Sequence, residues 1–187
     1  MKRKRHIDIQ RVVTISLTLV LLASILLFSI PIPIDTKIEA IEIKLDEPSY
    51  IHECSITING AYNLNLFTDD TFSGTIAVSS YDQTLEKMST VYFSKDGCPL
   101  YYHRFEEGSY NEAGQPIRYE YSLGKMMSGR LFRNMIIAVY SENPLNKDGG
   151  WKEGGSWETW NERDGYCIVT DVHSYEEAIS RVAQFSD

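Results

Sequence analysis

The sequence predicts a mainly β, antiparallel domain, either a barrel or a sandwich, with one transmembrane helix before it and one amphipathic helix at its C-terminal end. Three observations carry this prediction. Val12 to Ile34 is an uncharged, mostly apolar run. Several short runs of alternating apolar and polar residues follow it, separated by turn residues, as is typical of antiparallel β folds. Ser174 with Glu177 three residues later forms a helix-capping pattern close to the end of the chain.

Residues 12–34 are predicted to be a transmembrane anchor that contacts the lipid bilayer. A helix needs about 20 apolar residues to cross the hydrocarbon core. The eleven residues before the run carry a net charge of +4 and the residues after it carry −12, which together give the −8 of the whole chain. Positive residues beside a span stay in the cytoplasm. This places a basic tail, residues 1–11, inside the cell membrane and the domain of residues 35–187 outside it.

Cleavage of this segment as a signal peptide is the alternative. The apolar core of a signal peptide has about 7–15 residues and ends in small residues before the cut. The run here is longer, and Ala40 with Ile38 two places before it matches a cleavage site poorly. A retained anchor is therefore the main prediction, and cleavage stays open.

The composition of the outer domain excludes one class of partner. Its charge of −12 would repel the phosphates of nucleic acid. Its 12 Tyr, six Phe and three Trp favour strands. Three cysteines, Cys54, Cys98 and Cys167, allow at most one disulfide within the chain. Buried, unpaired thiols are the interpretation, although an outside location permits a disulfide.

The first strands are expected between a stalk that begins at Asp35 and the turn at Asp69-Asp70. The run from Ile41 to Leu45 alternates with Glu42 and Lys44, which predicts a half-buried strand with its acid facing solvent. Ser55 to Ile58 alternates as well, and Asn59-Gly60 follows it. Asn-Gly between two such runs predicts a hairpin turn.

Later strands are expected from the same patterns. The runs Met88–Ser94 and Leu100–Phe105 flank Lys95–Pro99, whose Asp-Gly and Pro predict another hairpin. Gly108–Pro116 is a polar loop by composition. The remaining strands are predicted at these ranges: Phe72–Ser79, Ile117–Tyr121, the continuous apolar run Met135–Tyr140, which should be a central strand, and Tyr166–Val172.

The C-terminal segment Ser174–Phe185 is predicted to be an amphipathic helix packed on the sheet. Ala178, Ile179, Val182 and Phe185 fall on one helical face, and Tyr175 joins that face one turn earlier.

One stretch resembles a known group of proteins. The residues Ile58-Asn59-Gly60-x-Tyr62, followed by Leu66-Phe67-x-Asp69-Asp70-x-Phe72-x-Gly74-x-Ile76, are similar to uncharacterised single-pass membrane proteins of Gram-positive bacteria. The resemblance covers roughly residues 40 to 140. It implies a bacterial, membrane-anchored, extracytoplasmic β-domain, and it carries no activity and no site residues.

No catalytic or metal-binding motif is present in the sequence. His52 and Cys54 share one face of a strand, but no second pair at metal spacing accompanies them, and a zinc site needs about four ligands. Asp69-Asp70 is interpreted as a turn rather than a cation site. The sequence therefore predicts no catalytic residues, no metal and no cofactor, and a protein that is more a binder than an enzyme.

The candidate contact residues are the tryptophans. Trp151, Trp157 and Trp160 all lie in one Gly-rich, acidic segment. An indole carries a large apolar area and is costly to leave in water. The three rings either close one end of the β-domain or form a platform for a ligand or a partner, and both interpretations stay open.

The function predicted from the sequence is a membrane-anchored, extracytoplasmic binding or interaction domain without catalytic activity, with a protein or a glycan as its partner. One alternative is a module directed at the cell wall or at glycans, with or without hydrolytic activity. The other is an accessory subunit of a membrane complex.

Overall fold

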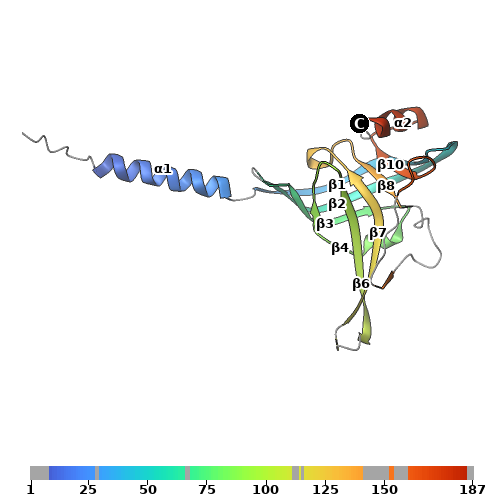
Figure 1. The fold of residues 1–187 in the computed structure, drawn as a ribbon, viewed down its shortest axis with the longest axis horizontal. Helices are drawn as coiled ribbons and strands as arrows, with labels where there is room; N and C mark the ends of the chain where they lie inside the picture. Colours follow the sequence, from blue (N-terminus) through green and yellow to red (C-terminus); the bar gives the residue numbers. More distant parts are fainter. Residues whose placement is uncertain are drawn as a thin grey trace, which may run out of the picture.

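The β-domain is one antiparallel sheet that curls into a half-barrel, with a helix packed on its outer face (Figure 1). A second helix, α1, stands away from the sheet at the N-terminal side (Figure 1). The structure is a computed structural model and describes residues 9–27, 30–65, 68–110, 114, 116–140, 152–153 and 160–184.

The helices are α1 (Ile9–Leu27) and α2 (Tyr175–Ala183), with short 3₁₀ helices η1 (Asp82–Leu85) and η2 (Arg130–Phe132). The strands are β1 (Ile30–Lys44), β2 (Glu47–Leu64), β3 (Thr71–Val78), β4 (Lys87–Met88), β5 (Val91–Tyr92), β6 (Cys98–Tyr110), β7 (Pro116–Met127), β8 (Ile136–Val139), β9 (Lys152–Glu153) and β10 (Tyr166–Thr170).

The order of strands across the sheet is β4-β6-β7-β8-β10-β1-β2-β3-β5, and β9 pairs with β7. The two outermost strands, β4 and β5, follow one another in the chain, so their segment bridges the two edges of the curled sheet. Ser89 N donates to Tyr101 O at 2.8 Å on one side, and Phe93 N donates to Asp70 O at 2.9 Å on the other. The predicted antiparallel β fold with a C-terminal helix is confirmed, and its single sheet curls instead of splitting into two layers.

Each face of the sheet has its own core. The large core fills the concave side, and a smaller one lies between the convex side and α2. β1 serves both, because alternate side chains point to opposite faces. Ala40 belongs to the concave core, whereas Ile41 and Ile43 belong to the convex one. β8 is buried along its whole length, which confirms the predicted central strand.

The half-barrel has two ends. The near end, on the side of α1, holds residues 65 and 68–70 and the loops 93–97 and 128–135. The far end holds the β1–β2 turn after Lys44, the start of β10 at Tyr166 and the segment from Ser79 to Leu85.

The predicted span of residues 12–34 is wrong at its C-terminal side. The helix ends at Leu27, and Ile30–Ile34 opens β1, paired with β2 as far as Leu64. Pro31 and Pro33 fit here because β10 reaches only Ala40–Lys44, which leaves this stretch of β1 at an edge that needs no N–H donors. In the part of the chain that the structure describes, no helix combines the length and apolar character needed to cross a membrane.

The predicted hairpin turn at Asn59-Gly60 is also wrong, because β2 continues through both residues. Gly60 pairs with Gly74 of β3. A Cβ on Gly60 would lie 2.4 Å from the carbonyl oxygen of Ser73. Gly60 therefore allows the backbones of β2 and β3 to approach closely. The Phe72 ring lies against both Gly60 and Gly74.

The hairpin predicted around Lys95–Pro99 is wrong as a pairing, although its turn exists. Gly97 N donates to Ser94 O at 3.1 Å, and Gly97 has a φ of 88°, a conformation that favours glycine. The two strands next to the turn do not pair with each other, because β5 pairs with β3 and β6 pairs with β7. Of the predicted first arm, Met88 in β4 pairs with Tyr102 of the second.

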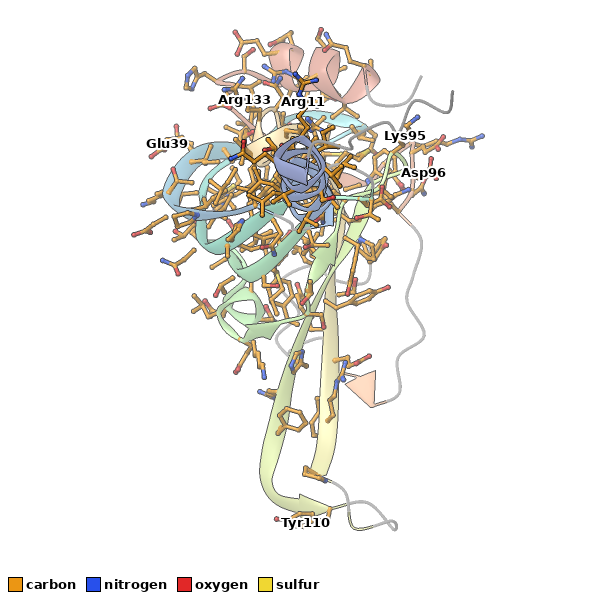
Figure 2. All side chains as sticks on the ribbon, turned by 90° about the vertical axis from the view of Figure 1, so that its left-hand side faces the viewer. Arg11, Glu39, Lys95, Asp96, Tyr110 and Arg133 are labelled. Atoms are coloured by element: carbon orange, nitrogen blue, oxygen red, sulfur yellow. The ribbon has the colours of Figure 1, made fainter. Side chains whose placement is uncertain are left out.

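The predicted polar loop of residues 108–116 is partly strand. β6 continues to Tyr110 and β7 begins at Pro116, so the two strands form a long arm that leaves the sheet. Figure 2 shows Tyr110 at the tip of this arm.

The capped C-terminal helix is confirmed. The Ser174 hydroxyl accepts from Glu177 N at 3.2 Å, and the Glu177 carboxylate accepts from His173 N at 2.9 Å. Ala178 and Val182 are buried against the convex core. Phe185 lies outside the described residues.

Candidate functional site

The far end of the half-barrel buries a glutamate. Glu42 lies on β1 between Ile41 and Ile43, which point to the convex core, so its own side chain points to the concave side. Only 3% of the residue is exposed. Its register partner on β2 is His52, which is exposed.

Tyrosine hydroxyls surround this carboxyl group. Tyr50 donates to Glu42 Oε1 at 3.1 Å, and Tyr81 forms a second side-chain hydrogen bond with the same carboxyl. Burial raises the pKa of Glu42 above its ordinary value, and the hydrogen bonds from Tyr50 and Tyr81 and the charge of His52 offset only part of this shift. Within the described residues Glu42 has no ion-pair partner, so the protein holds a carboxyl group that takes up a proton more readily than a carboxyl in water.

The tyrosines around Glu42 extend from the buried interior of the half-barrel to the surface of its far end. Tyr81 and Tyr121 are fully buried, and their pKa values are raised first by burial and then by the charge of Glu42. Tyr50 is half-buried and meets Tyr166 edge-on, with ring centroids 5.4 Å apart. Glu42 is therefore linked to the surface through Tyr50 and Tyr166.

Trp160, the one predicted contact residue that the structure describes, lies next to this rim. Its indole N–H donates to the backbone oxygen of Tyr166 at 3.2 Å, and its ring packs on the convex core. The ring is half-buried. Trp151 and Trp157 lie outside the described residues, so their predicted gathering with Trp160 stays a prediction.

The three thiols are buried and unpaired, as the sequence predicts. Burial raises the pKa values of Cys54, Cys98 and Cys167 to about 12 each. A thiol reacts as its thiolate, so none of the three is an activated nucleophile.

The residues that were weighed as metal ligands have other partners. His52 Nδ1 lies 3.5 Å from the Ser80 hydroxyl. Asp70 accepts from the Tyr62 hydroxyl and from Asn65 N, both at 2.8 Å, and thereby closes the β2–β3 loop. Among the described residues there is no group of three potential ligands that could hold a metal ion.

The sequence does not predict the burial of Glu42, and the reason is physical. The alternation of Ile41 and Ile43 with Glu42 predicts a strand that buries one face and leaves the acid in water. Both faces of β1 are covered at this point, one by α2 and the other by the concave core. The only available signal is the nearby Tyr50, which is too common a residue type to be specific.

The comparisons with known proteins add no assignment to this site. No family model matches the chain, and no curated protein and no solved structure is detectably similar to it. The function must therefore be argued from the residues of this chain.

Proposed function

We propose that this protein is a non-catalytic binding domain held at the outer face of the cell membrane by α1, with its N-terminus in the cytoplasm. The observation that carries the proposal is the surface of α1. Every described side chain from Gln10 to Ala23 is exposed, including Leu17 at 72% and Val20 at 65%. From Val12 to Ala23 this surface is aliphatic except for Thr14, Ser16 and Thr18, and such a surface without protein cover supports contact with lipid.

The binding surface that we propose is the convex side of the far end. Ile51 is 46% exposed there, directly opposite Ile43, which belongs to the same core as Trp160. Register partners in an antiparallel sheet lie side by side on one face. The far end thus offers an exposed aliphatic side chain and a half-buried indole, both at a rim that leads to Glu42.

Catalysis is the weaker alternative because Glu42 acts alone. A hydrolase directed at glycans needs two carboxyl groups across the bond that it breaks. Among the described residues, the groups that influence Glu42 are Tyr50, Tyr81 and His52, and none of them is a second carboxylate. Two hydroxyls already use the oxygens of Glu42, which supports a role in holding the site rather than in proton transfer to a substrate.

The anchor is tested on the full chain in its own cell type. We expect it to stay in the membrane fraction after an alkaline wash, and we expect protease added to spheroplasts to digest the domain. Release by the wash would refute the anchor, and protection of the domain together with a cytoplasmic control would refute the orientation.

The binding surface is tested by crosslinking. A photoreactive residue at position 51 should crosslink to one dominant partner, either a membrane protein or a glycan, and Trp160→Ala should abolish that product. The same residue at position 85 is the matched control, since Leu85 is 72% exposed in η1. Equal products from both positions would show contact without specificity and would contradict the proposed surface.

A further inference from the structure

The near end contains a hollow of about 390 Å³, which we name the Arg130 hollow. Its walls combine two aromatic side chains with charged and hydroxyl groups. The lining includes Tyr62, Asp69, Asp70, Phe93, Lys95 and Arg130.

The hollow is lined by equal numbers of positive and negative side chains. Arg130 and Lys95 contribute two positive charges, and Asp69 and Asp70 contribute two negative ones. Asp70 is 8% exposed and is occupied by Tyr62, by Asn65 N and by Arg130 Nε at 3.6 Å. The side chain of Arg130 is 76% exposed, and Lys95 and Asp69 are also exposed. The accessible groups are thus two cations and one anion, a pattern that suits a ligand with a phosphate group and an ammonium group.

A strained backbone presents this set of groups. Leu131, Phe132 and Asn134 have φ values of 57°, 61° and 52°, which non-glycine residues rarely adopt. Such conformations persist only where the surroundings enforce them, and they gather at functional sites. Phe132 is enforced by its burial among Tyr62, Phe72 and Phe93.

A second contact fixes the other side of the same loop. Arg181 of α2 donates to the Asn134 side chain at 2.6 Å. The loop is therefore held from both sides, with Arg130 on the rim of the hollow and Leu131 exposed at 41% beside it.

The Arg130 hollow lies at the end of the domain that α1 enters. Ile30, the first residue of β1, pairs with Leu64, and the loop that carries Asp69 and Asp70 begins one residue later. Three residue steps separate Leu27 from Ile30, and a fully extended chain covers at most about 11 Å in that number of steps. Viewed along α1, Lys95 and Arg133 lie on opposite sides of the helix axis (Figure 2).

We propose that the Arg130 hollow binds the zwitterionic headgroup of a phospholipid in the membrane that holds α1. Arg130 and Lys95 take the phosphate, because a guanidinium and an ammonium are the usual partners of phosphate oxygens. Asp69 takes the headgroup ammonium, and the exposed Leu131 enters the layer of acyl chains. This inference rests on the proposed function in one respect, the placement of α1 in a bilayer.

The test uses the full chain in dodecyl maltoside, a detergent without phosphate, and measures broadening of the ³¹P resonance of glycerophosphoethanolamine. This probe is the lipid headgroup without acyl chains, so it reports on the hollow whether or not α1 is in a bilayer. We expect binding, and we expect Arg130→Gln to weaken it by at least about tenfold, because the charged hydrogen bond of the guanidinium to the phosphate is lost. Lys95→Gln should weaken it less.

Arg133→Gln is the matched control, because Arg133 is exposed in the same loop and does not line the hollow. Equal loss in the Arg133 and Arg130 variants would reduce the effect to general charge and overturn the proposal. Inorganic phosphate binding as tightly as glycerophosphoethanolamine, with no effect of Asp69→Asn, would identify a site for free phosphate and overturn the headgroup assignment.

Flotation of the full chain with phosphatidylethanolamine vesicles separates the two proposals. If the chain floats but does not bind the headgroup, the proposed anchor is supported and headgroup binding in the Arg130 hollow is refuted. A chain that binds the headgroup in detergent but does not float refutes the anchor and leaves the headgroup site supported.

Discussion

The two ends of the half-barrel each bury a carboxyl group beside tyrosine, and they satisfy it differently. At the near end, Asp70 accepts from the Tyr62 hydroxyl and from Asn65 N and forms an ion pair with Arg130. At the far end, Glu42 receives hydroxyls from Tyr50 and Tyr81, and within the described residues no cation pairs with it.

The different partners of Asp70 and Glu42 show how the surroundings of a buried carboxyl group determine its role. A buried carboxylate costs several kcal/mol unless charge and hydrogen bonds offset it. Asp70 has both kinds of partner and serves to hold a loop. Glu42 has hydrogen bonds alone, so burial raises its pKa and its protonation depends on pH.

The largest expected effect tests the near end. Phe132→Ala removes the ring that Tyr62, Phe72 and Phe93 surround, and it should lower the free energy of unfolding by about 3–5 kcal/mol. Chemical denaturation measures this loss. Phe105→Ala on the arm is the control, because that ring is 52% exposed and its removal should cost far less. Similar losses in both variants would mean that the near end is not a packed core.

The next effect tests the charge at the same end. Asp70→Asn keeps the shape but removes the ion pair with Arg130 and leaves a nitrogen where an oxygen accepted, so it should cost about 1–3 kcal/mol. Asp69→Asn changes an exposed neighbour and should stay within about 0.5 kcal/mol. An equal, small effect of both changes would remove the contrast between Asp70 and Glu42.

The far end should show the opposite behaviour with pH. The folded-state pKa of Glu42 lies above its unfolded value of 4.5, so the folded protein binds more protons in that window. Stability from this group is complete below pH 4.5 and is lost as pH rises through the folded pKa. The stability of Glu42→Gln should therefore increase relative to that of the wild type as pH rises above 4.5.

Urea denaturation of both proteins across this range gives the difference, in which the other carboxyl groups cancel. Glu39→Gln, an exposed change on the same strand, is the matched control. A wild type that gains stability relative to the Glu42 variant as pH rises would show that the carboxylate is well compensated.

Sequence patterns predict an element well where one physical requirement dominates it. The uniformly apolar run Met135–Tyr140 predicts a covered strand, and Ser174 with Glu177 predicts the start of a helix. Both are confirmed. The pattern misleads where two requirements give the same residues. Asn59-Gly60 suits a tight turn, but the Gly60 of this chain meets another backbone at Gly74.

The candidate site was harder to predict because it depends on what covers each face. The apolar run Ile30–Ile34 is compatible with a membrane span or with a strand. It can be an edge strand because β10 pairs only with the later part of β1. Glu42 reads as a solvated acid until both faces of β1 are known to be covered. Of the three tryptophans, Trp160 alone can be placed, half-buried and bonded to Tyr166.

The smallest effect tests the strain that shapes the near end. Leu131 has a φ of 57°. A residue with a side chain is destabilised by about 1–2 kcal/mol in this conformation, and glycine is not. Glycine, however, loses more chain entropy on folding. Leu131→Gly should therefore raise the free energy of unfolding, by about 0.5 kcal/mol after the partly buried side chain is lost. Leu85→Gly makes the same change at an exposed position that is not among those with positive φ, so it should lower stability by about 0.5–1 kcal/mol. Thermal or urea unfolding of the two variants gives opposite signs if the loop is strained. A loss of stability in both would mean that the loop at Leu131 stores no strain and that Phe132 alone positions Arg130.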